Sequence, residues 1–356
     1  DPVDEGNAQF SRGSYEEALK GYTAALAADP KNETAAYNKA VTLQKLGKLE
    51  EAAQAYQAFL ADHPDHAEAT LNLGAIYRAT GKQAEGIALY NKHLKKDPYN
   101  SRILNNLAVL YRDKKDYKSA IDKVRTLLMR DQKNIDAYKN LALVYYDQGK
   151  YKLAQTILAN ALTMAKEQKV NDPDIHVNFG LTHLALGDKG KAMGSFKKAV
   201  EIDPQNEGAH RELAFLLSSL GRNAEALQAM DKAVTIAPTS FNKRSRGVLL
   251  YLSRDYDAAL DQFLQVSRTD PLFTETAWWL LRCYHMKQDQ KDAFEVYVLF
   301  LERSGASADE IKSVRETFER SGWTEVLRRI ADKLGKSSML PAGIYAQLGE
   351  KDEAFE

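Results

Sequence analysis

A 34-residue internal repeat constrains this chain more than any other feature of its sequence. Prolines lie 34 residues apart at Pro30, Pro64 and Pro98, and the same spacing returns between Pro204 and Pro238. Length alone, 356 residues, would suggest two or three domains. Because the units resemble one another, we expect a stack of similar modules instead.

Three further positions recur in most of these periods: a small residue, a large residue four positions later, and a turn glycine. The small residues are Ala18, Ala52, Ala120, Ala154, Ala192, Ala226 and Ala259, with Gly86 as a substitute; the large ones are Tyr22, Tyr56, Tyr90, Phe196 and Phe263; the glycines are Gly13, Gly47, Gly81, Gly149, Gly187 and Gly221. Apolar residues at helical spacing around these positions predict two antiparallel helices per unit, separated by the glycine. One pair cannot bury its own apolar face, so the pairs must stack.

This small-and-large pattern resembles the tetratricopeptide repeat (TPR) family from Gly6 to about Phe300. The resemblance implies an all-α, right-handed superhelical solenoid of about nine stacked helix pairs, with the first helix of each pair on a concave face. It also implies a recognition scaffold. We expect a first sub-array of five units over residues 1–172 and a second of four units over 173–303. Residues 304–356 should form a divergent helical pair and a truncated final unit.

Two stretches carry finer resemblances. Residues 127–181 resemble envelope TPR lipoproteins tied to gliding motility in myxobacteria, whereas the C-terminal stretch resembles TPR tails of bacterial signalling proteins. In that stretch we predict helices over 308–320 and 324–334, joined at Gly322 and Trp323. The chain is therefore either a free adaptor or the sensory or substrate-docking region of a longer signalling enzyme, such as a kinase, cyclase, transferase or transcription regulator. The first resemblance favours a bacterial envelope or periplasmic location, with the cytoplasm as the alternative.

One slot on the first helix is asparagine in five consecutive units. The five residues are Asn38, Asn72, Asn106, Asn140 and Asn178. A carboxamide both donates and accepts, so a row of amides can pair with a peptide main chain whatever its side chains. The row resembles the asparagine ladder in the TPR domain of O-GlcNAc transferase, which holds extended peptides. The alternative is that each amide bonds to the adjacent helix. In later units the slot holds Glu212, Ser245 and Trp279.

Other side chains expected to face the same groove are basic, aromatic, polar or aliphatic. They are Tyr37, Leu71, Arg78, Arg102, Asn105, Arg112, Lys139, Leu143, Tyr146, Val177 and Leu181. This mixture suits an extended or helical peptide with some acidic content. The alternative is an ordinary solvated surface.

The composition argues against several other classes of function. Forty-nine basic residues balance forty-nine acidic ones, whereas nucleic-acid binding needs a basic excess. The longest apolar runs, 247–252 and 296–301, are too short to span a membrane. The single cysteine, Cys283, is expected in the core, and the seven histidines, expected to be solvated or half-packed, lack metal-ligand spacing. We therefore predict a non-enzymatic adaptor for a protein or peptide partner within a larger bacterial assembly, with no catalytic residues, cofactor or metal.

Overall fold

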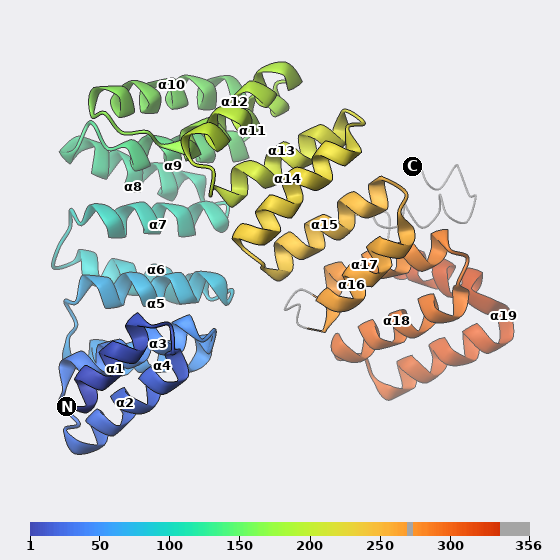
Figure 1. Cartoon of the computed structure of the whole chain (residues 1–356), viewed down its shortest axis with the longest axis horizontal. Helices are drawn as coiled ribbons and strands as arrows, with labels where there is room; N and C mark the ends of the chain where they lie inside the picture. The colour runs from blue at the N-terminus through green and yellow to red at the C-terminus, as the bar shows by residue number, and fades with distance from the viewer. Residues whose placement is uncertain (269–272, 335–356) are drawn as a thin grey trace. The chain divides into compact units, whose positions relative to one another are not determined.

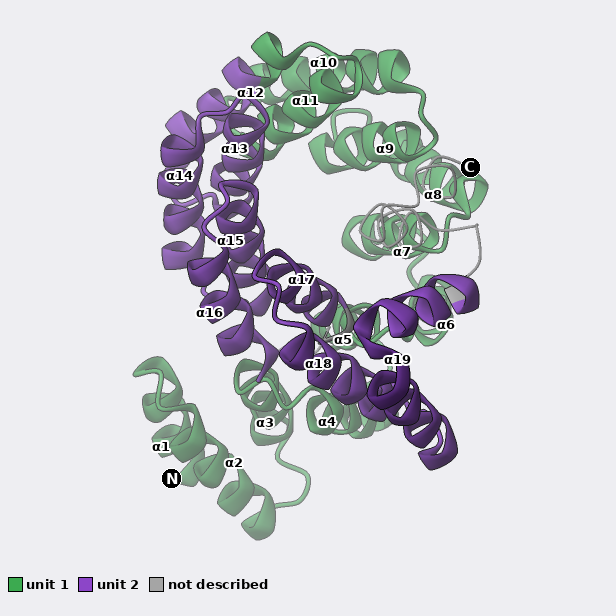
Figure 2. Cartoon of the chain, turned by 90° about the vertical axis from the view of Figure 1, so that its right-hand side faces the viewer, with its two compact units in different colours: residues 1–192 green, residues 193–356 purple. Residues whose placement is uncertain are grey.

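A computed structural model describes residues 1–268 and 273–334, which form nineteen α-helices and no strand (Figure 1). The chain divides into two compact units, Asp1–Ala192 and Met193–Glu356, coloured separately in Figure 2. The division falls inside α12 (Lys189–Ile202). The predicted all-α stack of helix pairs is confirmed. The sub-array boundaries after residues 172 and 303 stay predictions.

Unit 1 consists of helices that pack as sequential antiparallel pairs. They are α1 (Pro2–Ser11), α2 (Tyr15–Ala28), α3 (Glu33–Lys45), α4 (Leu49–Asp62), α5 (Ala67–Ala79), α6 (Gln83–Leu94), α7 (Ser101–Asp113), α8 (Tyr117–Arg130), α9 (Ile135–Asp147), α10 (Tyr151–Glu167) and α11 (Pro173–Ala185). The first helices α5, α7 and α9 also pack against one another. The faces of these first helices that point away from their paired second helices therefore form a continuous surface.

Unit 2 continues the same arrangement after α12. Its helices are α13 (Glu207–Ser219), α14 (Asn223–Ile236), α15 (Ser240–Leu252), α16 (Tyr256–Ser267), α17 (Phe273–Met286), α18 (Gln290–Arg303) and α19 (Ala308–Leu334). Inside α19, Gly322 has φ 75° and ψ −176°, which separates two helical segments as predicted. The expected truncated final unit, residues 340–356, lies outside the described residues.

The recurring large residue of the second helix packs against a glycine of the first helix in several of the pairs. Tyr90 of α6 is 1% exposed and lies against Gly74 of α5. A Cβ atom at Gly74 would lie 2.1 Å from the Tyr90 hydroxyl oxygen, so the two helices can approach this closely only because the residue is glycine. Gly247 and Phe263 repeat the contact in unit 2. In these pairs the large residue of the predicted pattern therefore lies between the two helices, against a first-helix glycine that lies 16 residues earlier and outside that pattern.

Each predicted turn glycine between paired helices has a left-handed backbone conformation. These glycines have φ between 73° and 82°. The same position holds Lys115, Arg254 and Gln288 in the units that lack glycine, with φ of 60°, 67° and 59°. The turn geometry is therefore kept even where the residue has a Cβ atom, which makes the left-handed conformation sterically strained.

Cys283 is buried as predicted, and six of the seven histidines are half-buried. Cys283 is fully buried in α17, and burial raises the pKa of its thiol to about 12. His93 departs from the prediction of solvated or half-packed histidines, because it is 7% exposed and its Nδ1 lies 3.4 Å from the Thr70 hydroxyl. The described residues contain no cluster of three or more His, Cys, Asp or Glu side chains arranged to hold a metal ion.

Candidate peptide-binding groove

The first helices α7, α9 and α11 position the candidate site. Side-chain caps fix where each begins: Asn100 accepts from the Ile103 amide at 3.1 Å, and Asn134 accepts from the Ala137 amide at 2.9 Å. Asp172 caps α11. In Figure 2, α7 and α9 lie on the inner side of unit 1, with α8 and α10 outside them. The caps set the helical register, so equivalent slots of successive units come side by side.

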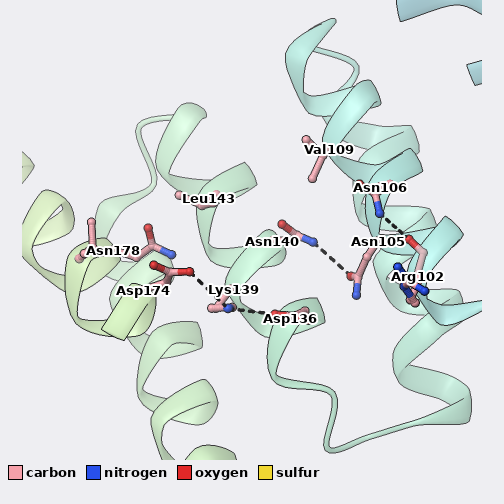
Figure 3. A pocket seen from close by; sticks show the side chains of 11 residues that line it. Arg102, Asn105, Asn106, Val109, Asp136, Lys139, Asn140, Leu143, Asp174 and Asn178 are labelled. Carbon is pink, nitrogen blue, oxygen red and sulfur yellow. Dashed lines mark hydrogen bonds and ion pairs between the residues drawn. The ribbon is translucent and has the colours of Figure 1, made fainter. Parts of the chain in front are cut away.

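A pocket of about 440 Å³ opens on this inner surface, and we call it the amide pocket (Figure 3). Its lining residues are Arg102, Asn105, Asn106, Val109, Asp136, Lys139, Asn140, Leu143, Asp174, Val177 and Asn178. Three slot asparagines therefore line one pocket, together with five other residues that the sequence placed in the groove. Val109, Asp136 and Asp174 were not predicted. The repeat contained the signal, because Asp136 lies 34 residues after Arg102 and Val109 lies 34 before Leu143.

The first two slot asparagines donate hydrogen bonds to side chains of neighbouring helices. Asn38 donates to the Asn7 side-chain oxygen at 3.0 Å. Asn72 donates to the hydroxyl oxygens of Tyr37 and Tyr56, at 3.3 and 3.1 Å. Tyr56 is fully buried, so the Asn72 amide hydrogen-bonds to a core residue of the preceding repeat. Neither asparagine lines the amide pocket.

The other three slot asparagines face the amide pocket with unused hydrogen-bonding capacity. Asn106 is exposed and donates to the Arg102 carbonyl in its own helix at 2.9 Å. Asn140 donates to the Asn105 side-chain oxygen at 3.1 Å (Figure 3). Asn178 is half-buried in the pocket wall. Each carboxamide has two N–H groups and an oxygen, so these contacts use only part of what the row offers.

Every basic side chain predicted to face the groove forms an ion pair with a carboxylate of a neighbouring unit. The pairs are Arg78 with Asp113 at 2.5 Å, Arg102 with Glu68, Arg112 with Asp147 at 3.4 Å, and Lys139 with Asp172 at 2.7 Å. The partners lie 33 to 35 residues apart, one repeat along the chain. These cations hold adjacent units together and give the groove little net positive charge.

Lys139 is the most enclosed of these cations, with 15% of its side chain exposed. Besides Asp172 it contacts Asp136 at 2.9 Å and Asp174 at 4.0 Å. Burial acts to lower the Lys139 pKa, but hydrogen bonds to Asp172 and Asp136 outweigh it and raise the pKa above its ordinary value. The ammonium group therefore stays charged at neutral pH.

The remaining predicted residues lie away from the amide pocket. Leu71 was expected in the groove but is 7% exposed and packs in the core with Ile103, because α7 covers it. Tyr37 is half-buried, with its ring 5.5 Å from that of Phe59. Tyr146 is half-buried too, and its ring lies edge-on to that of Tyr151 in α10. Leu181 is half-buried in α11.

A second pocket of about 370 Å³ lies beside the first, and we call it the side pocket. Its lining residues are Gly74, Ala75, Arg78, Ala79, Tyr90, Asn106, Leu110 and Asp113. Asn106 lines both pockets. The two pockets therefore meet on α7.

Family models match most of the chain up to residue 308. Models described as tetratricopeptide repeat match residues 37–101 and 245–308, residues 134–205 and residues 183–242. A model described as TPR repeat matches residues 6–47. The chain belongs to the tetratricopeptide repeat family. The resemblance of residues 127–181 to gliding-motility lipoproteins stays a prediction.

Among curated proteins, this TPR chain is similar to the peroxisomal targeting signal receptor of Kluyveromyces lactis, with 27% identity over 92 residues. The match covers 26% of this chain and 16% of the receptor. A solved tetratricopeptide repeat protein from Parabacteroides merdae has a TM-score of 0.61 and 19% identity, covering 71% of this chain and 97% of that one. A human IFIT1 dimer with PPP-AAAA has a TM-score of 0.57 and 17% identity, covering 98% and 87%. At these identities the two structures show a common fold alone.

Membership of the TPR family places the chain among protein–protein interaction modules. TPR proteins bind protein partners, and they are typically non-enzymatic. Within the residues that the structure describes, no helix combines the length and the apolar character needed to cross a membrane.

Proposed function

We propose that unit 1 binds an extended segment of a partner protein along the amide pocket. The observation that supports this most strongly is the convergence of Asn106, Asn140 and Asn178, from three successive units, on one pocket. An extended main chain offers one N–H donor and one carbonyl acceptor per residue. A row of amides matches that alternation without reading side chains.

The contacts inside the pocket leave suitable groups for such a ligand. The bond from Asn140 to Asn105 uses one N–H and one oxygen, so the Asn140 oxygen and the Asn105 amino group remain for a main chain. Val109 and Leu143 supply apolar surface between the amides. The result is a wall of polar groups interrupted by aliphatic side chains, which suits a peptide main chain with apolar side chains.

The charges of the pocket favour a ligand without net negative charge. Arg102 and Lys139 line it, but so do Asp136 and Asp174. Lys139 also pairs with Asp172, so three carboxylates surround this one ammonium group. We therefore propose a neutral or basic peptide in preference to the acidic one that the basic residues suggest on their own.

Selection from a phage-displayed library of random dodecapeptides on the intact chain tests this proposal. Selected peptides should bind the double variant Asn140→Ala/Asn178→Ala about five- to a hundredfold more weakly, since two hydrogen bonds contribute roughly 1–3 kcal/mol together. The matched control is Asn160→Ala, on the exposed outer face of α10. Thermal melts of all three proteins check folding. Failure of the wild type to enrich any peptide, or equal binding by the double variant, would refute the proposal.

The wider role that we propose is that of a non-enzymatic adaptor within a larger bacterial envelope assembly. The resemblance of residues 127–181 to gliding-motility lipoproteins supports the assembly and the compartment. Proximity labelling by the chain in its native cells tests this role. Labelling of envelope proteins, reduced by the Asn140→Ala/Asn178→Ala variant, is the expected result. Labelling confined to cytoplasmic proteins would contradict the envelope location.

A further inference from the structure

The side pocket is lined at one slot of α5 by a residue smaller than its equivalents in the neighbouring repeats. Ala75 occupies the position that is Val41 one unit earlier, and Val109 and Leu143 in the next two units. Ala75 is exposed and lines the side pocket, and Ala79 lines it one helical turn further on. The pocket beside it has a volume of about 370 Å³, and alanine at this slot extends less far into it than the branched aliphatic residues of the neighbouring repeats would.

The polar groups around the side pocket are already paired within the protein. The Arg78 guanidinium and the Asp113 carboxylate bind each other at 2.5 Å. The Tyr90 hydroxyl donates to the Leu71 carbonyl at 3.3 Å, and Asn106 donates within its own helix. An apolar occupant would therefore leave these contacts intact, whereas a buried polar group would compete with them.

The rest of the lining is apolar and firmly held. Leu110 and Tyr90 are each 1% exposed, and Gly74 lies against Tyr90. The packing of Gly74 against Tyr90 prevents this wall from moving inward. The cavity is thus pre-formed, and filling it buries apolar surface without reorganising the helices.

We propose that the side pocket receives one large aliphatic or aromatic side chain of the same extended peptide that occupies the amide pocket. This inference rests on the proposed function, because Asn106 lines both pockets and would hold the peptide main chain at their junction. The amide row binds main chain of any sequence. The side pocket supplies the sequence preference that the amides lack.

The decisive variant is Ala75→Leu, which narrows the pocket with the residue type found at the same slot two repeats later, at Leu143. The probe is the dodecapeptide phage library, selected in parallel on intact wild-type and Ala75→Leu chains. The wild type should enrich a large apolar residue at one peptide position, and Ala75→Leu should lose that enrichment or replace it with glycine or alanine. Val41→Leu, at the same slot but outside both pockets, is the control and should select like the wild type.

Affinities of one selected peptide give the quantitative test. Replacing its enriched apolar residue by alanine should weaken binding to the wild type about ten- to hundredfold, but binding to Ala75→Leu only a few-fold. Wild-type and Ala75→Leu chains that select the same sequences would overturn the side-pocket inference, while the proposed function would stand if Asn140→Ala/Asn178→Ala still bound weakly. A wild type that enriches no peptide would overturn both.

Discussion

The same slot of the first helix has different surroundings in the two units of the chain. In unit 1 it places Asn106, Asn140 and Asn178 in the wall of a pocket. In unit 2 it holds Trp279, whose ring stacks on fully buried Phe263 with ring centres 6.0 Å apart. One repeat position can therefore serve as surface in one unit and as packing in another.

The other slot residues of unit 2 are also engaged within the protein. Glu212 forms an ion pair with Arg211 at 3.4 Å, and burial raises the Glu212 pKa although the Arg211 charge opposes it. Ser245 is 6% exposed, beside Arg244, which pairs with Glu275 at 2.8 Å. The comparison teaches that a repeated slot fixes where a side chain lies, whereas its neighbours decide whether it is available to a ligand.

Truncating Trp279 is the strongest test of this comparison. Trp279→Ala should lower the free energy of unfolding by about 3 kcal/mol, because it removes the stack on Phe263 and leaves a cavity. Asn140→Ala, at the same slot, should cost under about 1 kcal/mol. Urea denaturation followed by circular dichroism measures both. Equal losses would mean that the slot has one structural role throughout the array.

Lys139 tests how far the groove of unit 1 depends on ion pairs between adjacent repeats. Lys139→Met should cost about 2 kcal/mol, because it leaves Asp172, whose side chain is 15% exposed, without its cation. The folded-state pKa of Lys139 lies above 10.5, so its contribution is complete below pH 10.5 and is lost as the pH rises through the folded-state value.

The pH dependence provides the control for that variant. Urea midpoints of wild type and Lys139→Met should differ at about pH 8 and approach each other as the pH rises through the raised folded-state pKa of Lys139, where the wild-type ammonium loses its proton. A difference that stays constant over this range would attribute the loss to packing of the lysine stem instead of its charge.

The sequence predicted the elements of this fold well because the repeat reports packing directly. The predicted large residues Tyr22, Tyr56 and Tyr90 are almost fully buried, and the predicted turn glycines are left-handed. The inter-unit ion pairs were also within reach of the sequence: Asp113 lies 35 residues after Arg78, and Asp147 lies 35 after Arg112. Opposite charges at about one period are a usable signal of contacts between adjacent units.

The division among the asparagines could not be predicted from the slot itself. Asn72 is committed because Tyr37 and Tyr56 place two hydroxyl oxygens beside it. Asn140 instead meets Asn105, a residue at a different slot of the preceding unit. Such pairings depend on rotamers and on the identity of neighbours across the helix interface, and one sequence with a shared consensus residue does not specify them.

Asn72 should therefore behave in the opposite way to Asn140. Asn72→Ala should lower the free energy of unfolding by about 1 kcal/mol, since it removes the donor to the buried Tyr56 hydroxyl, while binding of selected peptides stays unchanged. Thermal melts and titration of a labelled peptide measure the two effects. Weaker binding by Asn72→Ala without loss of stability would extend the peptide site beyond the amide pocket and contradict the division drawn above.

The smallest expected effect concerns the turns, where the two units should agree. Lys115 in unit 1 and Arg254 in unit 2 are exposed residues held at φ 60° and 67°, in a position that glycine fills elsewhere. Lys115→Gly and Arg254→Gly should each stabilise the protein by about 0.5 kcal/mol, because relief of the left-handed strain exceeds the entropy that glycine adds to the unfolded chain. Denaturation curves for the two variants and for Lys114→Gly, whose backbone has φ −80°, measure the difference. A gain at Lys115 without one at Arg254 would show that the units differ in their turns as well as in their inner slots.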